Sequence, residues 1–345
     1  MIRRNFFKKL LSLGTGFFSF AGFKNIASGS LSDWLYPQKS GANLKTRKIP
    51  KLGLKSKIII AQDSKILAKN GIAKKDATKK LISESIKNLT GEKDELNAWK
   101  SLFGKDDIVG IKINCLAGKG LSTRKEIVDL IIEGLRSAGF DDEQVIVWDK
   151  ADIDLQKAGY TINYSGKGAK CFGTNKDYDA EPEIIGSVGG CFSKIISSKC
   201  TAIINVPILK DHELSGVSLA MKNFYGAIHN PNKYHDSNCN PYVADLYSHP
   251  FIRDKVRLII CDAINAQYHG GPGYKPQWGW NFNGIIMGTD PVALDKIGAK
   301  IIENKRREKG FPSFKDAKRE PKYIATAADL KLGNDDPSKI EVVRV

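Results

Sequence analysis

The alternation of short β-branched runs with amphipathic helical segments constrains the fold of this chain most strongly. Residues 108–113 (IVGIKI) and 144–148 (QVIVW) are apolar runs typical of buried strands. The segment 122–137 between them has helical spacing, with Ser122 in the N-cap position and Glu126 in the first turn. A strand–helix–strand unit of this kind favours two parallel strands.

The same pattern recurs along the rest of the chain. We predict further strands at 57–61, 201–206, 256–261, 284–287 and 340–345. We predict further helices at 74–89, 94–103, 192–197, 215–225 and 290–306. Between 160 and 187 the sequence is Gly-rich and irregular. The expected fold class is therefore α/β, a mostly parallel central sheet flanked by helices with a small irregular β-rich insertion, in a single domain over residues 56–345.

The N-terminal segment has the pattern of an export signal. Arg3 and Arg4 precede a Phe-Phe-Lys run, and a glycine-diluted apolar stretch follows over residues 10–23, which is too short to span a bilayer comfortably. Paired arginines before a weak apolar run are typical of a twin-arginine signal. We predict a signal over residues 1–29, a linker over 30–55, the export machinery as a partner and a periplasmic location.

Two other interpretations of this segment stay open. The segment can remain uncleaved and anchor the protein, in which case it is the only contact with the membrane, or it can be the amphipathic start of a cytoplasmic protein. Because the twin-arginine route carries folded proteins that are often loaded with a cofactor, export would favour a bound cofactor without identifying it.

The charge and cysteine patterns narrow the class of partner. The formal net charge is +16, which fits either an anionic partner (nucleic acid, anionic lipid or an acidic ligand) or a lysine-rich solvated surface. No basic stripe interleaved with aromatic residues and no zinc-finger spacing occurs, so we predict no nucleic-acid binding. None of the six cysteines forms a C-x-x-C pair, which leaves no iron–sulfur or structural zinc motif. Disulfides are possible after export, but their pairing cannot be inferred from the sequence.

Polar residues follow several of the predicted strands, where open α/β sheets bind ligands. Asn114, Asp149, Asp262 and Asp290 occupy such positions, although Asp290 before Pro291 also suits a helix N-cap. All five histidines lie between positions 212 and 269, and histidine binds metals and carries protons near neutral pH. If a metal is bound, its candidate ligands are His212, Asp262 and Asp290.

Residues 205–226 are the most distinctive part of the chain. A strand would bring Lys210 and His212 to the sheet edge, and Gly216 would open a helix that carries Lys222 and Asn223 on an otherwise apolar surface. A lysine in that setting either extends to solvent or meets an anion or cofactor, and a helix start can hold an anion.

From these patterns we name candidate residues. The catalytic candidates are Lys210, His212 and His269, with a histidine moving a proton. The candidates for binding a metal, a lysine-linked cofactor or an anionic group are Gly216, Lys222, Asn223, Asp262 and Gly271. The turn that contains Gly271 is equally consistent with backbone amides approaching an anion and with a plain tight turn.

Three ordered motifs make the chain resemble the domain-of-unknown-function family 362 over most of residues 108–302. They are NVPILKDH (205–212) with GVSLAMKNFYG (216–226), DAI (262–264) with GGPG (270–273), and TDPVALD (289–295). The resemblance implies an activity that is unsettled in the family. Many relatives carry an added ferredoxin-like segment, whose cysteines are missing here, so electron transfer through a built-in cluster is not expected. A fainter likeness is to the sheet-edge histidine and glycine-to-lysine helix of lactate-racemase-like proteins.

Three functional hypotheses follow. The first is an exported cofactor- or metal-dependent enzyme that acts on a small anionic substrate, by redox or proton-transfer chemistry. The second is a non-catalytic periplasmic protein that binds an anionic ligand or a redox partner. In the third, the polar residues are helix caps and packing groups, and Lys222 faces solvent.

Overall fold

A central ten-stranded sheet organises the computed structural model, which describes residues 55–345. The predicted signal and all but the last residue of the predicted linker lie outside the described residues. The strand order is β12-β1-β11-β10-β7-β2-β3-β4, and β8 and β9 branch from β10. The strands of this sheet are β1 (Ser56–Gln62), β2 (Val109–Lys112), β3 (Val145–Trp148), β4 (Lys170–Cys171), β7 (Ala202–Asn205), β8 (Ile208–His212), β9 (Gly216–Ser218), β10 (Val256–Gln267), β11 (Gly279–Gly288) and β12 (Ile340–Arg344).

Most neighbouring strands in this sheet are parallel, as the sequence predicted. The parallel pairs include β2 with β3, β2 with β7, and β7 with β10. Only β11 and β9 run the other way. The predicted irregular insertion contains β4 and leads into a separate two-stranded hairpin of β5 (Glu183–Ile185) and β6 (Val188–Gly190). The predicted fold class is therefore confirmed.

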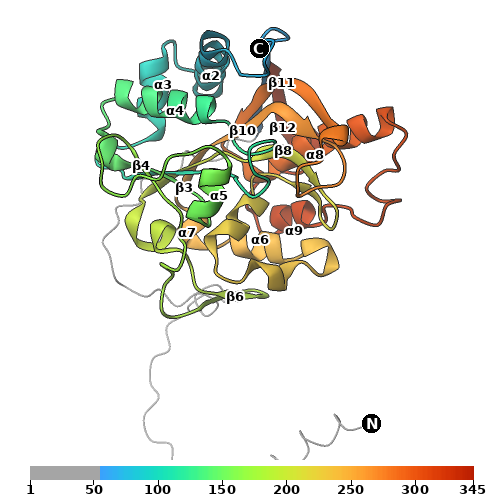
Figure 1. Cartoon of the computed structure of the whole chain (residues 1–345). Coiled ribbons are helices and arrows are strands. Elements are labelled where there is room, and N and C mark those ends of the chain that lie inside the picture. The colour runs from blue at the N-terminus through green and yellow to red at the C-terminus, as the bar shows by residue number, and fades with distance from the viewer. Residues whose placement is uncertain (1–54) are drawn as a thin grey trace, which may run out of the picture. The chain divides into compact units, whose positions relative to one another are not determined.

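Helices cover both faces of the sheet, as Figure 1 shows. On one face, Val109 and Ile111 of β2 share a core with Ile127 and Ile131 of α4. The other face packs under α6, α8 and α9. The helices are α2 (Lys75–Thr90), α3 (Glu95–Leu102), α4 (Lys125–Ser137), α5 (Asp152–Lys157), α6 (Tyr242–Tyr247), α7 (Pro250–Arg253), α8 (Pro291–Glu308) and α9 (Tyr323–Asp329). Short 3₁₀ turns include η1 (Asp142–Gln144), η3 (Lys222–Ala227), η4 (Pro231–Tyr234), η5 (Ser237–Cys239), η6 (Pro276–Trp278) and η7 (Pro337–Lys339).

The helix predicted over residues 215–225 is wrong. Residues 216–218 form β9, which pairs antiparallel with β8, and only Lys222–Ala227 make a 3₁₀ turn. Gly216 opens the strand at φ +73°, a left-handed conformation that suits glycine and reverses the chain in a tight hairpin. Because Gly216 starts a strand, it offers no helix N-terminus for an anion.

Two further helix boundaries differ from the prediction. Helix α4 begins after Arg124, because the Ser122 hydroxyl donates to the Gly118 carbonyl instead of capping the helix. The helix predicted over 192–197 is a π-helix, η2, over Ile195–Lys199. Asp290 caps α8 as predicted, since its Oδ1 accepts from the backbone N–H groups of Val292 and Ala293.

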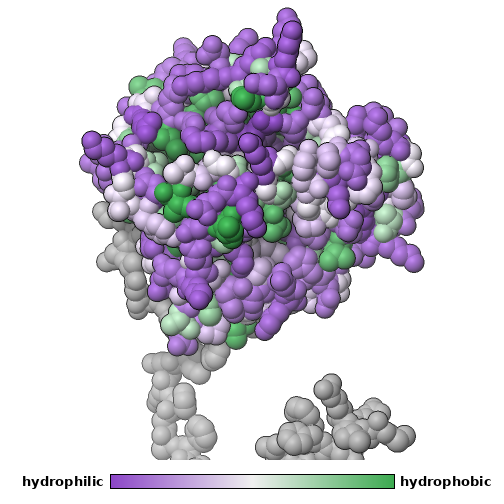
Figure 2. All heavy atoms as spheres, in the orientation of Figure 1, coloured by the Kyte–Doolittle hydropathy of each residue, from purple (hydrophilic) through white to green (hydrophobic). Residues whose placement is uncertain are grey.

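The surface drawn in Figure 2 is largely hydrophilic, with apolar residues scattered in small groups. Within residues 55–345, no helix combines the length and the apolar character that crossing a membrane requires.

Candidate functional site

A buried lysine stands at the carboxyl end of β2. The parallel register pairs Lys112 with Trp148 of β3 on one side and with Asn205 of β7 on the other. The Lys112 side chain is 1% exposed, and its Nζ lies 5.4 Å from the centre of the Trp148 ring. A charged amine at this depth requires acceptors from the protein itself.

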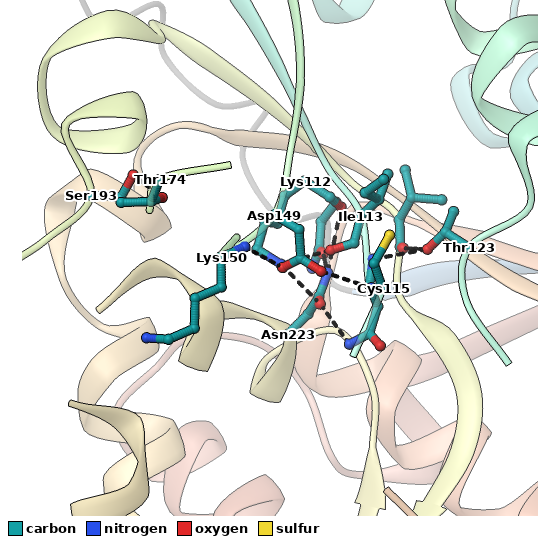
Figure 3. A network of polar contacts seen from close by, with 12 residues as sticks. Lys112, Ile113, Cys115, Thr123, Asp149, Lys150, Thr174, Ser193 and Asn223 are labelled. Atoms are coloured by element: carbon teal, nitrogen blue, oxygen red, sulfur yellow. Dashed lines mark hydrogen bonds and ion pairs between the residues drawn. The ribbon is translucent and has the colours of Figure 1, made fainter. Parts of the chain in front are cut away.

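The protein supplies these acceptors in full. Lys112 Nζ donates to Asp149 Oδ1 at 2.8 Å, to the Ile113 carbonyl at 2.7 Å and to Asn223 Oδ1 at 3.3 Å. The other oxygen of Asp149 accepts the backbone N–H of Cys115 at 2.7 Å. Figure 3 shows Lys112, Asp149 and Asn223 pointing toward one another. We call this group, with Asn205 and Asn114, the Lys112 network.

Asn223 joins the strands within the Lys112 network. Its Nδ2 donates to Asn205 Oδ1 at 2.7 Å, and its Oδ1 also accepts from Asn114 Nδ2 at 3.0 Å. Lys210 of β8 then donates to Asn114 Oδ1 at 2.9 Å. The network therefore reaches Lys210 through two amides, and the polar atoms of Asn223 are already bonded within the protein.

Lys210 is buried without a carboxylate beside it. Its amine bonds to the neutral Asn114 amide, and no carboxylate oxygen of residues 55–345 lies within 4 Å of it. Burial lowers the pKa of Lys210 to about 8, against the opposing charge of Asp149.

Lys222 is a second uncompensated lysine. It is 6% exposed, its Nζ lies 3.2 Å from His235 Nε2 and 3.5 Å from Cys239 Sγ, and it stands 3.9 Å above the Tyr225 ring. No carboxylate of the described residues lies within ion-pair distance. Burial lowers the pKa of Lys222 to about 8. We call Lys222, His212, His235, Cys239 and Tyr225 the Lys222 cluster.

The two histidines of the Lys222 cluster have assignable tautomers. His235 Nδ1 lies 3.2 Å from the Pro231 carbonyl, which can only accept, so its Nε2 is the nitrogen that accepts from Lys222. His212 Nδ1 accepts the backbone N–H groups of Leu214 and Ser215, so its proton is on Nε2. This Nε2–H has no hydrogen-bond partner among residues 55–345.

His212 stays neutral across the physiological range. Burial, followed by the charges of Lys222, His235 and Lys210, lowers the pKa of His212 to about 2. Its ring stacks on His235 with centroids 5.6 Å apart. His212 can therefore donate a hydrogen bond from Nε2 but cannot act as an imidazolium acid. His235 is only partly buried and forms the outer side of the cluster.

The segment that covers Lys222 has an uncommon backbone. Ser237, Asn238 and Cys239 are three successive non-glycine residues with φ between +51° and +60°. Left-handed backbone costs a non-glycine residue about 1 kcal/mol or more, and such conformations gather at functional sites. This left-handed turn places the Cys239 thiol against the Lys222 amine.

The structure does not bring His269 to His212. Side chains alternate along β8, so Asp211 points away from Lys210 and His212. Asp211 pairs with Arg319 at 3.1 Å, and Arg319 and Arg306 both donate toward His269 Nδ1, at 3.3 and 3.1 Å. His269 thus belongs to an arginine cluster on the other side of β8.

The remaining candidates have structural partners. Asp262 accepts the backbone N–H groups of Arg124 and Ile264, at the start of α4. Gly271 donates its N–H to Asp211 Oδ1, and a Cβ there would lie 2.1 Å from the Asp211 carbonyl oxygen, so only glycine fits. Asp290 is occupied as a helix cap. Across the described part of the chain, no three His, Cys, Asp or Glu side chains are grouped to hold a metal, so the structure does not unite His212, Asp262 and Asp290.

Several residues at the site were not among the sequence candidates. Asn114 and Asp149 follow strands, and that position was their only signal. Lys112 lies inside an apolar strand, and Cys239 has no local motif. Asp295 is fully buried and accepts the backbone N–H groups of Ala220 and Met221, which positions the chain entering η3.

The fold defines an α/β protein, and its candidate site places buried lysine side chains where several parallel strands end. The sequence model of the domain of unknown function DUF362 matches residues 109–300, more than half of the chain. The chain therefore belongs to the DUF362 family, as its motifs indicated. No curated protein sequence is significantly similar to it.

Among solved structures, one similar protein is from Thermotoga maritima and comes from a structural genomics consortium. It shares 10% identity with a TM-score of 0.35, over 68% of this chain and 59% of that protein. The chain thus matches less than two thirds of the length of that protein, and a likeness this distant carries no conclusion about function.

Proposed function

We propose that this protein is an enzyme that binds a small carboxylate- or phosphate-bearing substrate at Lys210 and the Lys222 cluster and transfers a proton there. The observation that carries the proposal is a pair of buried amines, Lys210 and Lys222, that have no carboxylate partner. An anion would supply the missing counter-charge, and the His212 Nε2–H is an unused donor beside them.

A fourth buried lysine, Lys255, shows that burial alone does not make a binding site. Lys255 is also 6% exposed, and burial likewise lowers its pKa to about 8. However, Lys255 donates to the carbonyls of Ile196 and Ser197 at the end of η2. Cations at helix ends are stabilised by such carbonyls, so Lys255 needs no ligand.

The test compares these lysines in anion binding. Isothermal titration and thermal shift with a panel of small carboxylates and phosphates would be measured for the full chain and for Lys210→Met, Lys222→Met and Lys255→Met. We expect the first two variants to lose affinity at least tenfold, while Lys255→Met binds as the parent does. Equal loss in all three, or no binding to the parent, would remove the proposal.

A second candidate function is a non-catalytic binding protein for an anionic ligand. The neutrality of His212 favours it, because an imidazole with a pKa of about 2 exchanges no proton near neutral pH. In the catalytic proposal His235, which is less buried and accepts from Lys222, carries the proton instead. His235→Gln distinguishes the two: turnover falls if the protein is an enzyme, and ligand affinity alone changes if it is not.

We also propose that the chain is exported by the twin-arginine route and works in the periplasm. The support is the Arg3-Arg4 pair before a short, glycine-rich apolar stretch. Replacing both arginines by lysine should retain the protein in the cytoplasm, and the N-terminus of exported protein should begin near residue 30. Unchanged export of the double variant would contradict this proposal.

A further inference from the structure

The Lys222 amine is placed as a nucleophile rather than only as a charge. His235 Nε2 accepts from it at 3.2 Å, and the lone pair of this nitrogen is fixed by the Nδ1–H bond to Pro231. Neither carboxylate nor carbonyl oxygen binds the amine within the described residues. A lysine in an apolar site beside a proton acceptor is the arrangement that activates amines for attack on carbonyl carbon.

The surroundings of Lys222 define what could react there. The His212 ring stacks on His235, and its Nε2–H has no partner among the described residues. Lys210 stands two residues before His212 on the same face of β8. These two groups suit a carboxylate. A ligand with a carboxylate and an adjacent carbonyl would offer the carboxylate to His212 and Lys210 and the carbonyl carbon to the Lys222 amine.

The charged and titratable groups around Lys222 are few. They are His235 from the end of η4, Cys239 from η5, His212 from β8 and the Tyr225 ring of its own turn. None is a carboxylate, and the contact with Cys239, which by itself raises the pKa of Lys222, only partly offsets the effect of burial. With its pKa lowered to about 8, a sizeable fraction of the amine is neutral near pH 8.

We propose that Lys222 forms an imine with a small 2-oxo acid, whose carboxylate is held by His212 and Lys210. This inference rests on the proposed anion-binding function and names its substrate class. The neutral amine attacks the carbonyl carbon, and the carbonyl oxygen takes a proton to give a carbinolamine. The C–O bond then breaks, and the oxygen leaves as water with the two hydrogens lost from nitrogen, one of them by way of His235. No oxidant or reductant is needed.

Access to the amine is past His235. This side chain is only partly buried and contacts the Lys222 amine, whereas Lys222 itself is 6% exposed, so we infer that a ligand reaches the amine past His235.

The test is reductive trapping on the full chain. Protein is incubated with glyoxylate or pyruvate and cyanoborohydride near pH 8, and modified lysines are mapped by peptide mass. We expect Lys222 to be the principal site, because an ordinary surface lysine has roughly a hundredfold less neutral amine at that pH. Lys222→Met should lose the adduct, and Lys255→Met should keep it although its lysine has a similarly lowered pKa.

The controls separate this inference from the proposed function. Glycolate and lactate carry the carboxylate without the carbonyl, and their binding is read by thermal shift. Binding of these acids and of pyruvate with no adduct at Lys222 would overturn the imine and leave the anion site standing. Neither binding nor adduct would overturn both. Adducts spread evenly over surface lysines would also overturn the imine.

His212→Gln tests the role of the carboxylate. We expect about tenfold more glyoxylate to be needed for half-maximal trapping, with Lys222 still the modified residue at saturation. Unchanged concentration dependence would show that His212 does not hold the ligand.

Discussion

The Lys112 network and the Lys222 cluster bury the same chemical group at one edge of the sheet, yet they are built in opposite ways. Lys112 meets a carboxylate, a carbonyl and an amide oxygen, all within 3.3 Å. Lys222 meets an imidazole nitrogen, a thiol and an aromatic ring. A buried charge with a complete set of partners holds the fold together, whereas one without them is available to a ligand.

The backbone differs between the two regions as well. Lys112, Asn114, Asp149 and Asn205 stand on or directly after the regular parallel strands β2, β3 and β7, and only Asn223 of this network comes from the turn η3. Lys222 and Tyr225 stand on the 3₁₀ turn η3, His235 directly follows η4, Cys239 lies in η5, and only His212 of this cluster belongs to a strand, β8. Regular strands therefore fix most of the first group, while most of the second is held by short turns that can rearrange at lower cost.

The largest expected effect is from Lys112→Met. This change leaves the Asp149 carboxylate buried without its counter-charge, and breaking a buried pair in this way costs about 3–5 kcal/mol. The free energy of unfolding would be measured by urea titration. Adding Asp149→Asn should restore part of the loss, and a loss below about 1 kcal/mol for the single variant would show that the ion pair is not structural.

Lys222→Met, unlike Lys112→Met, should not destabilise the protein. Methionine matches the unbranched side chain and removes a charge that burial disfavours, so we expect no loss of stability at pH 7, or a gain of about 1 kcal/mol. The same titration measures it. A loss similar to that of Lys112→Met would mean that the two regions do not differ as described.

The pH dependence of this stability difference follows from the lowered pKa of Lys222. Its pKa is about 8 in the folded state and 10.5 as the ordinary value, so between these pH values the unfolded chain binds more protons and raising the pH stabilises the parent. The advantage of Lys222→Met should be full below pH 8 and shrink toward pH 10.5. The stability difference between Lys255→Met and the parent should narrow in the same pH window, since the pKa of Lys255 is also about 8. A stability difference between parent and Lys222→Met that does not change with pH would show that the Lys222 amine does not lose its proton in this range.

The smallest effect expected is in backbone dynamics. Amides of residues 231–241 should exchange with solvent faster than those of β2, β3 and β7, because short turns open at lower free energy than central strands. Hydrogen exchange with mass spectrometry measures this. Pyruvate should slow exchange in the turn segment while leaving the strands unchanged, and equal protection of both regions before ligand is added would contradict the comparison.

Much of the fold could be predicted from local pattern. The apolar runs that became β2, β3, β7 and β10 are buried on both faces, so their composition is unambiguous. Asp290 before Pro291 was correctly identified as a cap. The segment after Gly216 was misread, because Val217, Leu219 and Met221 alternate with small residues and fit a strand as well as a helix.

The candidate site was predicted only in part. Lys210, His212 and Lys222 were identified from their motif: Lys210 and His212 share one face of β8, and the His212 ring stacks on His235, which accepts from Lys222. Asn223, Gly271 and Asp262 were identified as well, but their polar atoms are bonded within the protein. Cys239 could not be found, because only a left-handed turn remote from any motif brings its thiol to Lys222.

The sequence by itself determined the class of fold, the family and some of the candidate residues, among them Lys210, His212 and Lys222, because strand composition, turn residues and motif order are local properties. Only the tertiary structure decided that Lys112 is paired with a carboxylate and that Lys210 and Lys222 are not. That depends on the parallel register that sets Lys112 beside Trp148, and so next to Asp149, and on the alternation along β8 that points Asp211 away from Lys210 and His212. Counter-charges in a folded protein are chosen by distance in space, which no local pattern encodes.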